Sequence, residues 1–312
     1  MVTPKEIVEA ARALNEGKLV VPPTETVYGL GADARSDDAV AKIYAAKKRP
    51  EFNPLIVHVA NLEAAEKLGN FKGVAMRLAR AFWPGALTLV VPKALNCQAS
   101  QLATAGLNTI ALRVPAHPVA QLLLNTADLP IAAPSANASG KLSPTQVSHL
   151  QDLDETNLAM VLDAGPTEVG LESTIVACEG EKATLLRPGG ISREEIEDVI
   201  GHPLAEQEQN DKPNAPGQLA SHYAPKASMR LEVTETAPNE GLLAFGDVVV
   251  KHAGPLRNLS EEGDLQEAAA NLFRMLHELD EEADRIAVMA VPNEGLGEAI
   301  NDRLRRAAAP RT

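Results

Sequence analysis

Three polar loops contain the residue types that could bind a small charged substrate. The first is the segment PPTETVYGLG at 22–31, in which hydroxyl groups and a carboxylate stand between two prolines and two glycines. Prolines stiffen a loop, and glycines let a ligand approach the backbone closely. We expect this loop to hold a small zwitterion, with a loop that only connects two elements as the alternative. The spacing G-x-G-x-x-A at 29–34 does not indicate a dinucleotide site, because that motif needs its glycines directly at a strand end.

The second loop is basic and follows a predicted helix. Lys47 and Arg49 stand two residues apart, and the segment NPLIVH follows at 53–58. A lysine point charge and an arginine fork at this spacing can converge on one phosphate or carboxylate. Each feature also has a structural explanation. Basic residues favour helix C-termini, and a histidine such as His58 within an apolar strand is usually a core residue.

The third loop follows a short apolar strand. It reads AAPSANASG at 132–140 and continues to SPT at 143–145, so small hydroxyl and amide side chains collect at a strand end. Open α/β sheets bind their ligands at such ends. Ser135 stands in no evident Ser/His/Asp arrangement, which favours a hydrogen-bonding role over a nucleophilic one. The segments 172–174 and 187–190 carry similar polar groups, for which a cap and a turn are the alternatives.

The apolar pattern around these loops predicts a framework of strands and helices. Short apolar runs predict strands at 19–21, 55–59, 87–91, 109–114, 131–133, 159–162, 173–177 and 183–186. Capping residues and helical periodicity predict helices after Thr3, after Ser36, and at 74–82, 118–125 and 193–200. Strands and helices alternate without strict order. The expected fold is therefore α/β, with a twisted, open, mixed sheet and flanking helices.

A change in composition divides the chain. Residues 201–225 are polar, rich in proline and without periodicity, which is typical of a linker between domains. Residues 1–200 are predicted to form the larger domain, and 226–312 a small α/β, Rossmann-like domain. The second domain is expected to hold strands at 229–233, 242–245 and 286–291 and helices at 265–279 and 296–308.

The charge distribution opposes one class of partner and favours another. The chain has a net charge of −13, which argues against a protein that coats nucleic acid or anionic membranes. Residues 39–151, however, carry 11 basic and 4 acidic side chains, a local charge of +7. The segment with the second and third loops is thus suited to an anion such as a nucleotide phosphate. Solvated surface lysines are the alternative explanation.

The cysteine content and the lengths of the apolar runs indicate the cellular compartment of the protein. Cys97 and Cys178 are the two cysteines and lie far apart, which excludes a disulfide scaffold or a cysteine zinc site. No apolar run reaches the roughly 20 residues that a membrane span requires, and the N-terminus lacks the apolar segment of a signal peptide. We expect a cytoplasmic protein with no membrane partner.

Taken in order, the polar segments form a recognisable set. PTETVYGLG, KKRP with NPLIVH, LRVPAHP, PIAAPSAN with SPT, ESTIV and LLRPGG follow one another along the chain. This ordered set resembles the YrdC-like threonylcarbamoyl-AMP synthases. The linker and the second domain resemble the long form of that family. The resemblance covers essentially the whole chain and is strongest over 19–191.

The resemblance implies a nucleotidyltransferase. Such enzymes convert L-threonine, bicarbonate (or CO2) and ATP into L-threonylcarbamoyladenylate and pyrophosphate, with Mg2+ accompanying the ATP. A separate downstream tRNA threonylcarbamoyl transferase then modifies the adenosine beside the anticodon. A weak or transient contact with tRNA is compatible with this function.

The resemblance also implies roles for individual residues. The family's K-x-R and S-x-N motifs would supply the catalytic residues Lys47, Arg49, Ser135 and Asn137. Threonine would be held by Thr26, His58, Arg113, the backbone near Ala133, and Ser173. ATP would be held by Arg49, Asn53, Thr109, Ser135, Ser143, Arg187 and, from the linker, Tyr223. No residue is assigned as a metal ligand.

The chemistry of this reaction agrees with those roles. The threonine amine must be neutral to attack CO2, and the resulting carbamate is an anion that must approach a triphosphate. Repulsion is the main obstacle, so fixed positive charge and positioning should supply most of the catalysis. Lys47 and Arg49 would serve there, while Ser135 and Asn137 would orient the reactants. Since the sequence offers no compact carboxylate cluster, phosphates and water are expected to supply most Mg2+ ligands.

Two other functions compete with this one. A YrdC-like RNA-binding module without catalysis would use the +7 segment, but the net charge and the lack of interleaved aromatic residues oppose it. Carbamoyl-transfer maturation enzymes that share this domain resemble longer chains with zinc-finger-like cysteines, which this sequence lacks. The linker segment APGQLASHYAP departs from many relatives, which carry a Met after the glycine and a basic pair before HY. A charged clamp from this stretch is therefore in doubt, and the second domain is a lid or a docking surface only as a hypothesis.

Overall fold

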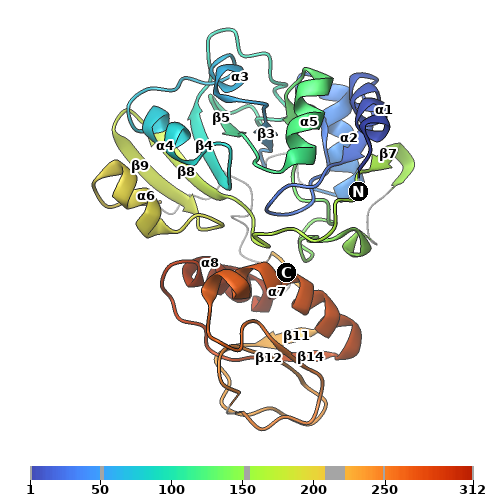
Figure 1. Cartoon of the computed structure of the whole chain (residues 1–312), viewed down its shortest axis with the longest axis vertical. Coiled ribbons are helices and arrows are strands. Elements are labelled where there is room, and N and C mark those ends of the chain that lie inside the picture. Colours follow the sequence, from blue (N-terminus) through green and yellow to red (C-terminus); the bar gives the residue numbers. More distant parts are fainter. Residues whose placement is uncertain (1, 50–52, 151–154, 208–221, 249, 311–312) are drawn as a thin grey trace.

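The computed structural model describes residues 2–49, 53–150, 155–207, 222–248 and 250–310, which form two stacked domains (Figure 1). The larger domain lies at the top of this view and the smaller one below it. Residues 208–221, most of the predicted linker, lie outside the described residues. The domain limits predicted from the sequence therefore stay a proposal.

A mixed sheet organises the first domain. Its strands are β1 (Leu19–Val21), β2 (Ala32–Asp33), β3 (Ile56–His58), β4 (Leu87–Pro92), β5 (Thr109–Arg113), β6 (Ile131–Ala132), β7 (Leu158–Val161), β8 (Thr174–Glu179), β9 (Lys182–Arg187) and β10 (Ala205–Glu206). The 8-stranded sheet has the order β10-β9-β8-β4-β5-β3-β6-β2, and β1 pairs with β7 apart from it. Because β4 runs parallel to β8 but antiparallel to β5, the sheet is mixed, as predicted.

Helices cover this sheet, and two of them begin at the expected capping residues. They are α1 (Pro4–Asn15), α2 (Asp37–Lys47), α3 (Leu62–Glu66), α4 (Val74–Phe82), α5 (Pro118–Ala127) and α6 (Arg193–Ile200), with 3-10 turns η1 (Val147–His149) and η2 (Glu155–Asn157). Thr3 caps α1 in a capping box, and the Ser36 side chain caps α2. The sequence did not predict α3, the two 3-10 turns or the short strands β2 and β10.

Alternate residues of β4 separate two apolar layers. Leu87 and Leu89 belong to the main core, which also contains Leu78 of α4. Val90 belongs to a smaller cluster with Ile56 of β3. This alternation is the period of two that a strand imposes on its side chains. The smaller cluster lies on the face of the sheet where the pocket described below is found, because Ile56 also lines that pocket.

Two boundaries bear directly on the polar loops. Lys48 ends α2 with a left-handed backbone, φ of 50°, so the chain turns sharply between Lys47 and Arg49. The predicted strand at 173–177 begins one residue later, at Thr174. The carbonyl of the preceding Ser173 accepts a 2.7 Å hydrogen bond from the Arg187 side chain.

The second domain is built on a parallel sheet. Its strands are β11 (Ser228–Arg230), β12 (Gly241–Ala244), β13 (Leu256–Asn258) and β14 (Arg285–Val288), in the order β11-β14-β12-β13. Its helices α7 (Leu265–Glu282) and α8 (Gly297–Ala308) lie between this sheet and the first domain (Figure 1). The predicted α/β character is confirmed, although β13 was not predicted and β11 ends earlier than expected.

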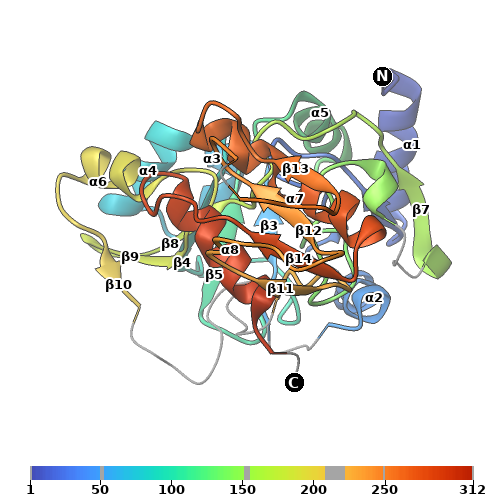
Figure 2. The ribbon, with the colours of Figure 1, turned by 90° about the horizontal axis from the view of Figure 1, so that it is seen from below.

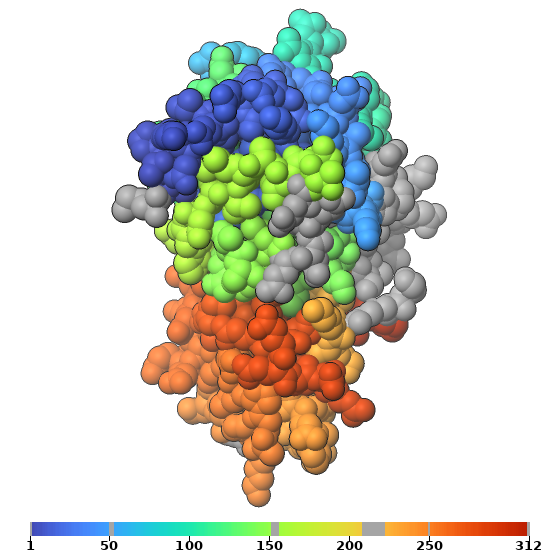
Figure 3. All heavy atoms as spheres, turned by 90° about the vertical axis from the view of Figure 1, so that its right-hand side faces the viewer, coloured from blue at the N-terminus to red at the C-terminus, as the bar shows by residue number. Residues whose placement is uncertain are grey.

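The two domains are in direct contact. Arg193 of α6 pairs with Glu298 of α8 at 2.7 Å, and the ring of His149 stacks on His277 of α7 with centroids 3.9 Å apart. In the view from below, the second domain lies in front of the middle of the first sheet (Figure 2). Figure 3 shows the same close packing from the side. Among the described residues, no helix is both long and apolar enough to cross a bilayer.

Candidate active site

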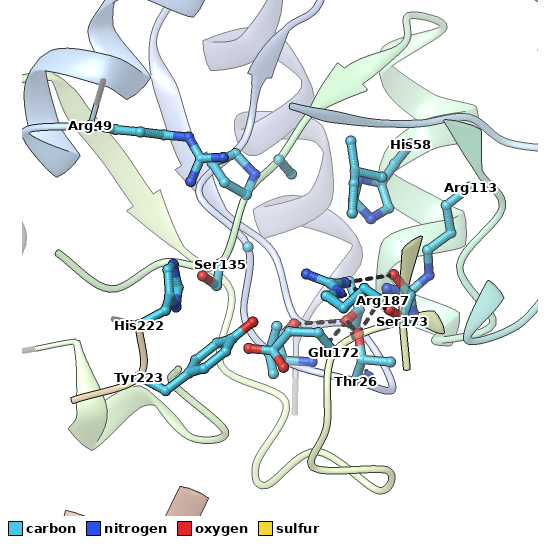
Figure 4. A pocket seen from close by; sticks show the side chains of 16 residues that line it. Thr26, Arg49, His58, Arg113, Ser135, Glu172, Ser173, Arg187, His222 and Tyr223 are labelled. Carbon is cyan, nitrogen blue, oxygen red and sulfur yellow. Dashed lines mark hydrogen bonds between the residues drawn. The ribbon is translucent and has the colours of Figure 1, made fainter. Parts of the chain in front are cut away.

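The polar ends of several strands meet in one pocket of the first domain, whose empty space, its open mouth included, is about 530 Å³ (Figure 4). Nine residues assigned from the motifs line it: Thr26, Arg49, His58, Arg113, Ala133, Ser135, Ser173, Arg187 and Tyr223. Arg49 and Arg113 lie on opposite sides, and Tyr223 lies on the side of Arg49 (Figure 4). Guanidinium groups therefore stand on two sides of the pocket, which suits the anionic groups of a ligand.

Arg113 is fixed at the end of β5 by three hydrogen bonds. It donates from Nη1 to Thr26 Oγ1 at 2.8 Å, from Nη2 to Glu25 Oε1 at 2.6 Å and from Nε to the Gly85 carbonyl at 3.1 Å. Burial raises the pKa of Glu25, but the Arg113 charge and hydrogen bond outweigh it and hold that pKa below its ordinary value. Glu25 is thus an ionised carboxylate that fixes the guanidinium beside Thr26.

His58 contributes a neutral ring to the pocket. Burial, followed by the Arg113 charge, lowers the pKa of His58 to about 3. Its Nδ1 atom is buried and has no hydrogen-bond partner among the described residues. A buried polar atom of this kind usually finds a partner, and a bound ligand is one way to supply it. A core histidine with both ring nitrogens satisfied by protein groups is therefore not what the described residues show.

Ser173 and Arg187 form one unit on the neighbouring strands. Arg187 donates from Nη2 to the Ser173 carbonyl at 2.7 Å and to its Oγ at 3.2 Å. The Ser173 hydroxyl also hydrogen-bonds that of Thr88 at 2.7 Å. The last residue of β9 and the residue before β8 are thereby locked together. A residue assigned to ATP and one assigned to threonine share one hydrogen-bond network.

Arg49 and Lys47 occupy different environments although they are two residues apart. Arg49 lines the pocket and donates to the carbonyls of Asn53 at 3.4 Å and Pro54 at 3.2 Å. Lys47 does not line the pocket; its ammonium donates to the carbonyls of Ser135, at 2.5 Å, and Asn137. Burial lowers the pKa of Lys47 well below its ordinary value, and the Arg49 charge adds to this effect. The expected convergence of both side chains on one ligand is thus not the arrangement in this structure.

Comparison with known proteins places this site in a family. A family model for Sua5, YciO and YrdC proteins, described as "Telomere recombination", matches residues 12–189. A second model, "Threonylcarbamoyl-AMP synthase, C-terminal domain", matches residues 191–309. The chain belongs to the Sua5-type threonylcarbamoyl-AMP synthases. This family consists of nucleotidyltransferases that serve threonylcarbamoyladenosine modification of tRNA.

Individual Sua5-type proteins match over nearly their full length. The threonylcarbamoyl-AMP synthase of Bacillus subtilis is 42% identical, over 98% of this chain and 94% of its own. That of Pyrococcus abyssi is 41% identical, over 97% of this chain and 94% of its own. The crystal structure of P. abyssi Sua5 complexed with L-threonine superposes with a TM-score of 0.89 at 37% identity, covering 99% of this chain and 95% of the other. The fold and family expected from the motifs are confirmed.

Within this Sua5-type pocket, five assigned residues do not line the wall: Lys47, Asn53, Thr109, Ser143 and Asn137. Asn137 donates from its amide to the carbonyls of Ala138 and Lys141, so it orders its own loop. The Ser143 hydroxyl donates to Glu172 Oε1 at 2.5 Å just behind the wall. Thr109 begins β5 whereas Arg113 ends it, which separates them by roughly 13 Å along the strand. Both amide atoms of Asn53 are buried without hydrogen-bond partners among the described residues.

Sequence reasoning missed several residues of the site. Thr24, Glu172 and His222 line the pocket, and Glu25 holds Arg113 from behind. His222 could have been found from the sequence, because it directly precedes Tyr223 in the HYAP segment, and Tyr223 was assigned to the site. Burial and nearby cations lower the pKa of His222 well below its ordinary value, so this ring is neutral like that of His58. The two glutamates stand in polar segments that the sequence singled out, but their pairing with arginines carries no signal, since those arginines lie far away in the sequence.

Proposed function

We propose that this chain condenses L-threonine, bicarbonate (or CO2) and ATP to L-threonylcarbamoyladenylate and pyrophosphate in the pocket between Arg113 and Arg49. The observation that carries this proposal is the presence of both guanidinium groups in one pocket, on opposite sides, in a chain of the Sua5-type family. A related enzyme from P. abyssi was solved in complex with L-threonine, which supports threonine as one substrate.

We assign the threonine end to the side of Arg113. Its guanidinium, fixed by Glu25, Thr26 and Gly85, suits the threonine carboxylate. The neutral ring of His58 suits a hydrogen bond with the amine or hydroxyl. With a pKa of about 3, this ring is too weak a base to hold a proton at neutral pH. The amine must therefore lose its proton to solvent or to the incoming bicarbonate.

We assign the nucleotide end to the side of Arg49. The neutral amine attacks CO2, and an oxygen of the resulting carbamate attacks the α-phosphorus of ATP, with pyrophosphate as the leaving group. Arg49 and Arg187 line the pocket and would offset the repulsion between the carbamate and the triphosphate. Lys47 would act on the reaction indirectly, because its ammonium donates hydrogen bonds to the backbone carbonyls of Ser135 and Asn137. The S-x-N loop would then present its side chains in a fixed position.

We propose that Mg2+ arrives with ATP rather than occupying a protein site of its own. No group of three or more His, Cys, Asp or Glu side chains converges within the described part of the chain. The carboxylates of Glu25 and Glu172 are ion-paired with Arg113 and Arg303. Phosphate oxygens and water would therefore hold the Mg2+, which would supply charge neutralisation. We also propose a cytoplasmic location, a weak or transient tRNA contact, and a downstream tRNA threonylcarbamoyl transferase that consumes the product.

The test is pyrophosphate release by the full chain. We expect release only when ATP, threonine and bicarbonate are all present. Arg49→Ala should lower the rate by about 100-fold or more, as loss of a fixed transition-state donor does. Lys47→Ala should also lower the rate strongly, because the Ser135 and Asn137 loop loses the side chain that holds its backbone in place. Lys48→Ala is the matched control, because Lys48 lies between them but is exposed, and it should retain activity. Release without threonine, or full activity of both variants, would contradict the proposal.

A further inference from the structure

A buried arginine of the second domain contacts the wall of the catalytic pocket. Arg303 lies on α8 and is fully buried. It donates from Nε to Glu172 Oε2 at 2.8 Å and from Nη2 to the Pro188 carbonyl at 2.9 Å. Its guanidinium carbon lies 5.0 Å from the centre of the Tyr223 ring. One side chain thus connects three separate segments, and two of its contacts, Glu172 and Tyr223, line the pocket.

These segments adjoin the hydrogen bond between Arg187 and Ser173. Glu172 precedes Ser173, and Pro188 follows Arg187. Arg303 therefore hydrogen-bonds to both chain segments that form this bond, one through Glu172 and the other through Pro188. Because Glu172, Ser173 and Arg187 all line the pocket while Arg303 does not, the arginine acts on the site only through them.

Arg303 also balances a charge that opposes ATP. Burial raises the pKa of Glu172, but Arg303, then Arg187 and the hydrogen bond from Ser143, lower it below its ordinary value. The pocket wall thus carries an ionised carboxylate on the side assigned to an anionic nucleotide. Arg303 and Glu172 have side chains 0% and 7% exposed, so solvent screens neither charge well. Without Arg303, the carboxylate would repel the triphosphate and lose its main partner.

We propose that Arg303 is a positioning residue for the nucleotide half of the site, through which the second domain completes the catalytic pocket. The inference rests on the proposed function, because it takes the pocket to bind ATP. It makes the second domain part of the active site rather than a separate module. It also predicts a defect in ATP use that is larger than any defect in threonine use.

The test compares full-length variants in two assays, pyrophosphate release and direct binding of ATP by calorimetry. Arg303→Met should raise the KM and the Kd for ATP by about tenfold or more, with a smaller change in the KM for threonine. Glu172→Gln combined with Arg303→Met removes both buried charges together. This double variant should recover most of the ATP affinity. Arg303→Lys should recover part of it, because lysine restores the charge without the fork.

Glu298→Gln is the matched control, since it breaks another ion pair of α8 with the first domain, away from the pocket. It should lower thermal stability without changing the KM for ATP. Equal defects for ATP and threonine, or no recovery in the double variant, would reduce Arg303 to a structural residue and overturn the proposal. If the wild-type chain binds ATP but releases no pyrophosphate, the proposed function fails while the binding comparison still tests Arg303. If Arg303→Met does not fold, the double variant and Arg303→Lys decide the question by their ATP affinity.

Discussion

The ion pair between Glu25 and Arg113 allows a quantitative test of how the threonine end is held. The two side chains are 8% and 4% exposed, and their closest atoms are 2.6 Å apart. Glu25→Gln keeps the shape and one acceptor oxygen but leaves Arg113 as a buried cation beside a neutral group. Breaking a buried pair in this way costs about 3 kcal/mol in the free energy of unfolding at pH 7. The KM for threonine should rise as well, because Arg113 loses its fixed position.

The pH dependence isolates this carboxylate. The pKa of Glu25 in the folded chain lies below its ordinary value of 4.5. Its contribution is therefore fully present above that ordinary value and is lost as the pH falls through the folded pKa. The stability difference between wild type and Glu25→Gln should be largest at pH 7 and should shrink at acid pH. Groups beyond the reach of the Glu25 charge titrate alike in both proteins and cancel from the difference, whereas that charge raises the pKa values of His58 and His117.

The assay is urea unfolding followed by the fluorescence of Trp83, the one tryptophan of the chain. Trp83 packs against Phe71 and donates to the Leu87 carbonyl at 2.7 Å, so it reports on the first domain. Glu63→Gln is the control, because its pair with Lys67 is exposed and should leave the curve unchanged at every pH. Equal stability of wild type and Glu25→Gln at pH 7 would refute the reasoning. So would a difference that stays constant down to pH 3.

Three further predictions follow from other parts of the structure. Burial, followed by the His277 charge, lowers the pKa of His149 from 6.5 to about 3. Below pH 6.5 the unfolded chain therefore binds a proton that the folded chain does not, so the fold loses stability as the pH falls from 6.5 toward 3. The melting temperature of His149→Phe should therefore fall less steeply than that of wild type over this range. EDTA should abolish pyrophosphate release without changing the melting temperature, and added Mg2+ should restore the release. A Cβ at Gly189 would lie 2.3 Å from the Glu172 carbonyl oxygen, so Gly189→Ala should destabilise the chain by about 1–3 kcal/mol in urea and reduce pyrophosphate release.

Much of the fold follows from local sequence patterns. Apolar runs at 87–91 and 109–114 predicted strands, and Thr3 and Ser36 marked the helix starts, because caps and periodicity depend on residues a few positions apart. The short strands β2 and β10 were missed because two residues give no period. The order of the strands in the sheet could not be derived, since it depends on pairing between distant segments.

The motifs and their order also determined the family and most of the residues that line the pocket, because those residues lie in loops of recognisable spacing. Only the tertiary structure decided which of them face the pocket. Lys47 and Arg49 are neighbours in the sequence, yet a turn at Lys48 sends one ammonium to backbone carbonyls and one guanidinium to the pocket.

The pairing of the buried glutamates was decided in three dimensions. Glu25 lies 88 positions from Arg113, and Glu172 lies 131 positions from Arg303. No local pattern encodes such pairs. Each carboxylate can be buried only where folding brings a distant guanidinium within hydrogen-bonding distance. The sequence by itself therefore determined what chemistry the chain can carry, while the packing of the two domains decided how its charges are balanced around the substrates.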